Sequence, residues 1–167
     1  TTQQIAEIRE KLGLNQPLVT QFGIWIGKVL QGDFGESFFF KKTVAQLIVQ
    51  RMEPTLALTV VTLFLAVMVA VPLGVLAAYR QGSWIDRMVM GFSVLGFSVP
   101  IFVFGYLLVW VFALQLGWFP VQGYAYLADG FFPFIYRLIL PAITLSVIYI
   151  ALIARITRAS MLEVLGE

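Results

Sequence analysis

Serines and threonines inside the long apolar stretches of this chain are its first candidates for chemistry. Among them are Thr59, Thr62, Ser93, Ser98, Thr144 and Ser146. A hydroxyl becomes a nucleophile only when a base or a metal ion activates it, and the chain contains no histidine and no cysteine. Because no base stands near these hydroxyls along the sequence, we expect no catalytic residues, no metal site and no cofactor.

The same apolar stretches contain no Asp, Glu, Lys or Arg. Transporters that are driven by protons or sodium ions generally place ionisable groups near the middle of the membrane. The sequence therefore disfavours ion coupling, and any catalysis would have to come from another subunit.

The hydroxyls have a structural and a functional interpretation. Serine and threonine in membrane helices usually donate to the carbonyl four residues earlier, or they pack between helices. Alternatively, Ser93 and Ser98, which lie beside Gly96 and the break at Pro100, line an aqueous path for a solute. Tyr106 offers a larger polar group on the same stretch. We therefore predict Ser93, Ser98, Pro100 and Tyr106 as translocation-path residues, and both interpretations stay open.

The composition indicates which solvent this chain requires. Apolar residues make up 60% of its 167 residues and charged residues only 12%, far from the composition of a soluble domain. A soluble protein of this composition would expose large hydrophobic patches, which a bilayer would cover. Eleven Lys and Arg residues against nine Asp and Glu give a net charge of only +2, and the basic residues are scattered. This pattern disfavours a nucleic acid partner.

Three long charge-free stretches set the expected architecture, because about 20 helical residues cross a bilayer. We expect membrane spans at about 55–78, 88–112 and 138–154. An aromatic outer loop at 116–136 would connect the last two spans, and residues 155–167 would continue the final helix beyond the membrane. The predicted fold class is an all-α, polytopic helical transmembrane protein.

The polar N-terminal part is expected to lie outside the membrane. We divide the chain into an extracytoplasmic segment at 1–53 and a transmembrane region at 54–167. Within the first segment, the spacing of apolar residues predicts a short helix at 3–12 and an interfacial helix at 18–30. Thr43 is suited to cap a further helix that leads into the first span.

The basic residues predict an orientation. Arg80 and Arg87 lie on one side of the membrane, and Arg155 and Arg158 return to that side after two further crossings, so we expect this side to be cytoplasmic. The N-terminal segment and the 116–136 loop then face outward. We predict Arg155, Arg158 and Glu163 as a cytoplasmic coupling region that a motor subunit moves. The alternative is the ordinary polar surface of a helix that emerges into water.

Eight strings of residues occur, in the same order, in the inner-membrane permeases of dipeptide and oligopeptide ABC importers, a family also used for nickel and glutathione. They are REKLGLNQP (9–17), GDFGES (32–37), PLGVLAA (72–78), GSWIDR (82–87), SVPIF (98–102), LGWFP (116–120), LPAITL (140–145) and ARITRASMLEVL (154–165). Over essentially its whole length, the chain resembles this family and most of all the first of its two permease subunits. Glu53 and the Phe38 to Phe40 run look individual to this chain.

The resemblance implies a six-span permease fold in the bacterial inner membrane, with the first span before Thr1 and the last two after Glu167. It implies a second permease subunit, two cytoplasmic ATPase subunits that hydrolyse ATP, a periplasmic or lipid-anchored solute-binding protein, and surrounding membrane lipid. The coupling helix of such permeases would lie just beyond this segment. The implied function is transport of peptides or a similar small solute, not enzymatic catalysis. The solute itself is left open, and a non-transporting membrane scaffold is the alternative.

Overall fold

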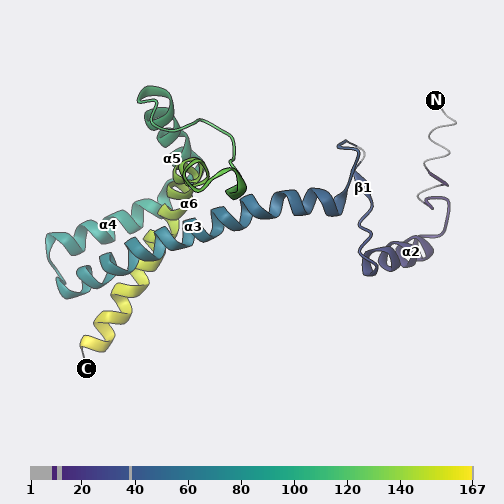
Figure 1. The fold of residues 1–167 in the computed structure, drawn as a ribbon. Coiled ribbons are helices and arrows are strands. Elements are labelled where there is room, and N and C mark those ends of the chain that lie inside the picture. Colours follow the sequence, from purple (N-terminus) through teal and green to yellow (C-terminus); the bar gives the residue numbers. More distant parts are fainter. Residues whose placement is uncertain (1–8, 11–12, 38, 167) are drawn as a thin grey trace. The chain divides into compact units, whose positions relative to one another are not determined.

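The computed structural model describes residues 9–10, 13–37 and 39–166. The chain divides into two compact units, Thr1–Met52 and Glu53–Glu167, and its described residues are mostly helical (Figure 1). The helix expected at 3–12 falls largely outside the described residues.

The first unit contains the helix α2, Leu18–Leu30. It coincides with the helix expected at 18–30, whose position at the membrane surface stays a prediction. Apolar side chains project from it into the surroundings, among them Phe22 and Trp25, whose ring centroids are 6.0 Å apart. A small antiparallel pair of strands follows, β1 (Glu36–Ser37) and β2 (Lys42–Thr43), which the sequence did not predict.

The longest helix, α3, runs from Val44 to Tyr79. The Thr43 hydroxyl accepts the N–H of Gln46 at 3.3 Å, which confirms the expected cap. Thirty-six residues correspond to about 54 Å of helix, more than the hydrocarbon core of about 30 Å. The helix continues through Pro54 and Pro72. Helix α3 contains the span expected at 55–78 and is long and apolar enough to cross a membrane.

The span expected at 88–112 is not one straight helix. It consists of α4 (Trp84–Ser98) and α5 (Ile101–Leu108), and a π-helix, η1 (Val109–Gln115), continues α5. The two parts are bent by 103°, as a broken span or a re-entrant segment would be. Pro100 has no N–H to continue the helix and favours extended backbone at the residue before it, where Val99 has φ −95° and ψ 124°.

The second long helix, α6, runs from Phe131 to Leu165 and is also long and apolar enough to cross a membrane. The irregular part of the expected outer loop at 116–136 ends at Gly130 after a short 3-10 turn, η2 (Leu127–Asp129), and residues 131–136 form the first turns of α6. Pro133 fits in the first turn of α6, where a missing N–H removes no helical hydrogen bond. The connection between residues 116 and 130 is called the 116–130 loop below.

Small residues bring α6 close to the other helices of the second unit, and α6 packs against both α4 and α5 (Figure 1). A Cβ atom on Gly74 of α3 would lie 2.6 Å from the Thr157 Cβ, and one on Gly96 of α4 would lie 2.8 Å from the Ala151 Cβ. On α5, a Cβ at Gly105 would lie 3.0 Å from Thr144. The buried core is accordingly built mainly from alanines, namely Ala66, Ala70, Ala77 and Ala154, with Val89 and Ile150. Such close packing is typical of helices in membranes.

We predict that Gly96→Ala lowers the free energy of unfolding by about 1–3 kcal/mol relative to Gly91→Ala, because the new methyl group overpacks the contact with Ala151. Gly91 is a matched control on the same helix, since a Cβ there has no neighbour within 4 Å. Both changes gain the same helix propensity. Unfolding of the purified protein by sodium dodecyl sulfate in mixed micelles measures the difference. Equal stability of the two variants would show that the α4–α6 contact tolerates a side chain.

Candidate functional site

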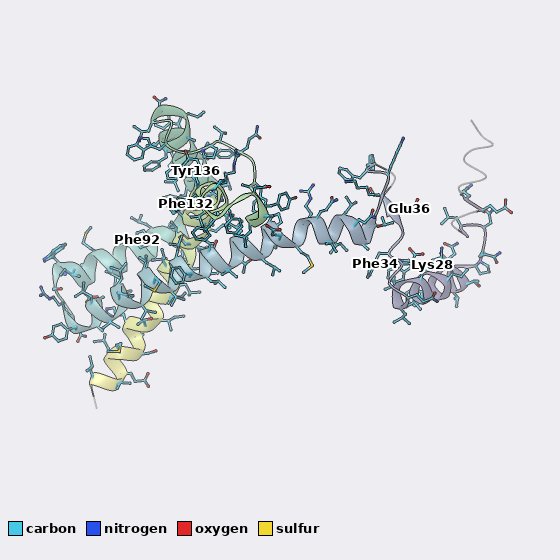
Figure 2. The ribbon with its side chains drawn as sticks, in the orientation of Figure 1. Lys28, Phe34, Glu36, Phe92, Phe132 and Tyr136 are labelled. Carbon is cyan, nitrogen blue, oxygen red and sulfur yellow. The ribbon has the colours of Figure 1, made fainter. Side chains whose placement is uncertain are left out.

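Helix α4 ends at Ser98, just before the break predicted from Pro100. The Ser98 hydroxyl donates to the Val94 carbonyl at 2.9 Å. A cavity of about 240 Å³ lies beside the break and is lined by apolar residues of α4, α5 and α6, among them Phe92, which Figure 2 labels. The ends of α4 and α5 at the break therefore leave an unfilled apolar cavity between them and α6.

Most hydroxyls in the apolar helices are satisfied within their own helix. Ser93 is buried and donates to the Val89 carbonyl at 3.0 Å. Thr59, Thr144 and Ser146 likewise donate to carbonyls three or four residues earlier. Thr62 is buried, and its hydroxyl has no hydrogen-bond partner in the described part of the chain. The structural interpretation thus accounts for most of these hydroxyls, and a role in solute passage stays a prediction.

The four predicted path residues do not share one cavity among the residues that the structure describes. Tyr106 lines a larger cavity of about 500 Å³ between α5, the 116–130 loop and α6, and its side chain is exposed. Ser93, Ser98 and Pro100 line neither this cavity nor the smaller one at the break.

An ion pair joins the start of α4 to the far end of α6. Oδ1 of Asp86 lies 2.5 Å from Nε of Arg158, and Oδ2 accepts a second hydrogen bond from Nη2 at 2.8 Å. The Gly82 N–H also donates to Oδ2, at 2.9 Å. The Asp86 side chain is 6% exposed and that of Arg158 is 21% exposed. This is the two-pronged geometry in which arginine holds a carboxylate most firmly, and we call it the Asp86–Arg158 junction.

The three residues predicted as a coupling region differ in their surroundings, because one of them belongs to the Asp86–Arg158 junction. Arg158 is partly buried against Asp86, whereas Arg155 and Glu163 are exposed on the same helix. Only the latter two present free surface to a partner in this structure. Asp86 was not predicted as a partner of Arg158, although its charge is opposite and both were expected at the same side of the membrane.

At the opposite end of α6, the 116–130 loop is fastened to α3 through Glu53. One carboxylate oxygen of Glu53 accepts the Leu127 N–H at 2.9 Å and the Tyr124 hydroxyl at 3.3 Å. Partial burial raises the pKa of the Tyr124 hydroxyl, and the negative charge of Glu53 raises it further, so the hydroxyl remains a donor at neutral pH. Glu53 had stood out in the sequence, but its partners are more than 70 residues away.

The loop is also fastened to the beginning of α6. The hydroxyl of Tyr136, labelled in Figure 2, donates to the Trp118 carbonyl at 2.6 Å. Nη1 of Arg137 donates to the Gln122 carbonyl at 3.3 Å. Gly123 has φ +105°, and a Cβ there would lie 2.5 Å from Nη1 of Arg137, so glycine is required for this close approach. Among the described residues, no group of three or more Asp or Glu side chains is placed to hold a metal ion.

Long apolar helices that pack through small residues, with charged side chains at their ends, define a polytopic helical membrane protein. The chain belongs to the family described as the inner membrane component of binding-protein-dependent transport systems, whose model matches residues 70–167.

Two relatives show how far the similarity extends. A protein of Sinorhizobium fredii named as a probable peptide ABC transporter permease is 55% identical over 167 residues, which are 100% of this chain and 53% of that protein. The glutathione transport system permease protein GsiC of Escherichia coli is 41% identical over 165 residues, 99% of this chain and 51% of GsiC. The chain thus spans about half the length of these curated relatives.

We predict that Asp86→Asn and Arg158→Gln each destabilise the protein, toward the lower part of the range of about 3–5 kcal/mol that breaking a buried ion pair costs, because Arg158 keeps some contact with solvent. The double variant should cost less than the sum of the two single changes, with a coupling energy of about 1–3 kcal/mol. Unfolding by sodium dodecyl sulfate in mixed micelles gives all three values. Arg155→Gln, at an exposed site on the same helix, is the control and should have little effect; simple additivity of the two junction variants would argue against the junction.

Proposed function

We propose that this chain is the central part of a membrane-spanning subunit of an ATP-driven importer for peptides or a similar small solute. The observation that carries the proposal is the family match over residues 70–167, on a chain whose three long apolar stretches, at about 55–78, 88–112 and 138–154, contain no Asp, Glu, Lys or Arg. Both relatives described above are named as permeases of transport systems, one for peptides and one for glutathione. ATP hydrolysis would take place in two separate cytoplasmic subunits.

The proposed orientation assigns a task to each end of the second unit. The 116–130 loop faces outward, where a solute-binding protein delivers its cargo, and the hydrogen bonds to Glu53, Tyr136 and Arg137 keep the loop in one shape for docking. The exposed Arg155 and Glu163 face the ATPase subunits. A second permease subunit completes the path.

Coupling between these ends requires an element that moves and contacts that transmit the movement. The Asp86–Arg158 junction ties the start of α4 to α6, so a displacement of α6 by the ATPases also displaces α4. The bend at Val99 and Pro100 is where α4 and α5 change their relative angle. Ser98 and Pro100 would then be exposed to the solute in one of the two states, and Ser93 would follow the movement of α4.

We predict that Pro100→Leu in the full-length subunit, with its partner subunits present, reduces solute uptake on the order of tenfold, equivalent to about 1.4 kcal/mol in the barrier. Leucine restores an N–H at the break and favours a continuous helix. Pro72→Leu is the matched control, because Pro72 is an exposed proline inside the continuous helix α3. Uptake of a radiolabelled tripeptide by cells that lack the native subunit measures the effect, and immunoblotting of membranes measures insertion.

Normal uptake by Pro100→Leu would contradict a role of the break in transport. If cells without the subunit retain the uptake of every peptide, nickel chelate and glutathione offered, the importer assignment fails and a non-transporting scaffold becomes the better interpretation.

A further inference from the structure

We propose that the 500 Å³ cavity between α5, the 116–130 loop and α6 binds an anionic phospholipid, with the lipid phosphate at Arg137 and one acyl chain along the two helices. This inference depends on the membrane location of the chain and not on the proposed transport function.

The guanidinium of Arg137 supplies the charge at the mouth of the cavity. Arg137 is half-buried, lines the cavity and donates from Nη1 to the Gln122 carbonyl. In the part of the chain that the structure describes, it forms no ion pair with a carboxylate. A guanidinium has five N–H donors and pairs best with carboxylate or phosphate. The hydrogen bond to Gln122 places the guanidinium against the loop, where a Cβ on Gly123 would lie 2.5 Å from Nη1.

The shape and lining of the cavity suit a hydrocarbon chain. Its volume of about 500 Å³ lies within the usual range of small-ligand sites. Apolar side chains of α5, η1 and α6 dominate the lining, among them Phe102, Val109, Leu140 and Leu145. From Arg137 to Leu145 the helix rises about 12 Å, most of one leaflet of a hydrocarbon core that is about 30 Å thick. One charge at the boundary and an apolar interior below it match the anatomy of a phospholipid.

A peptide fits the same cavity less well. Its backbone amides and its ammonium group need hydrogen-bond partners, and each one buried without a partner costs about 1–3 kcal/mol. No Asp or Glu lines the cavity, and the Thr144 hydroxyl already donates to the Leu140 carbonyl. A phospholipid brings one anionic group for Arg137 and hydrocarbon for the rest.

The test is native mass spectrometry of the purified full-length subunit from nanodiscs of phosphatidylglycerol and phosphatidylcholine in equal amounts. We expect the wild type to retain phosphatidylglycerol and Arg137→Gln to retain at least severalfold less. Val109→Phe, which fills the cavity while leaving Arg137 in place, should lose the lipid as well. Arg155→Gln, at the opposite end of α6, serves as the matched control for loss of one positive charge and should behave as the wild type.

Two further arms separate the possible sources of the anion. Inorganic phosphate at millimolar concentration should not displace the lipid, because it lacks the acyl chain. Displacement by a tripeptide with a free carboxylate would instead assign the cavity to solute and overturn the proposal. Equal retention of phosphatidylglycerol by the wild type and both cavity variants, or equal retention of the two lipids by the wild type, would also overturn it.

Discussion

The close approach of α6 to α3, α4 and α5 is the constraint on which the rest of the second unit depends. Inside a bilayer, apolar side chains gain little from leaving lipid for protein, so helices associate through dispersion contacts that require their backbones to approach closely. Gly74, Gly96 and Gly105 each leave room for one stretch of α6, and a side chain at any of them would meet atoms at 3.0 Å or less. Without these glycine contacts with α6, neither the bend at Pro100 nor the polar contacts at the ends of the helices would be held in place.

The polar contacts at the two ends of α6 complement that apolar packing. A buried ion pair is weak evidence for net stability, because the cost of desolvating both charges offsets much of their attraction. Its stronger effect is geometric, since Asp86 and Arg158 are 72 residues apart in sequence and fit in only one register of α4 on α6. The position of the 116–130 loop is likewise determined by its hydrogen bonds to Glu53, Tyr136 and Arg137. Close packing of small residues along the middle of α6 and specific hydrogen bonds at its two ends together define one arrangement of the helices.

The sequence predicted the local features and missed those that depend on packing. Helix α3 follows from the uncharged run between Glu53 and Arg80, and the helix at 18–30 and the Thr43 cap follow from apolar spacing and cap chemistry. The presence of Pro100 predicted a break in the span but not the bend of 103°. The angle depends on how α4 and α5 each pack against α6, through Gly96 and Gly105. The aromatic residues before Arg137 were assigned to a loop because their composition suits the headgroup layer, which does not distinguish a loop from the first turns of a helix. The partners of Glu53 and Asp86 could not be found from local spacing at all.

The pattern of satisfied hydroxyls also limits how this segment can handle a solute in the proposed importer. Ser98 donates its hydroxyl hydrogen to a carbonyl of its own helix, so on the proposed path it would offer a passing solute acceptor lone pairs but not that hydrogen. Ser93 is bonded in the same way and is buried. A surface of this kind binds weakly, which favours release of solute once the subunit changes state. Tight binding along the path would hold the solute in both states and would leave less of the free energy of ATP hydrolysis to drive import. In the proposed importer, strong selectivity would therefore belong to the delivering protein, and this segment would contribute a weakly binding wall to the path.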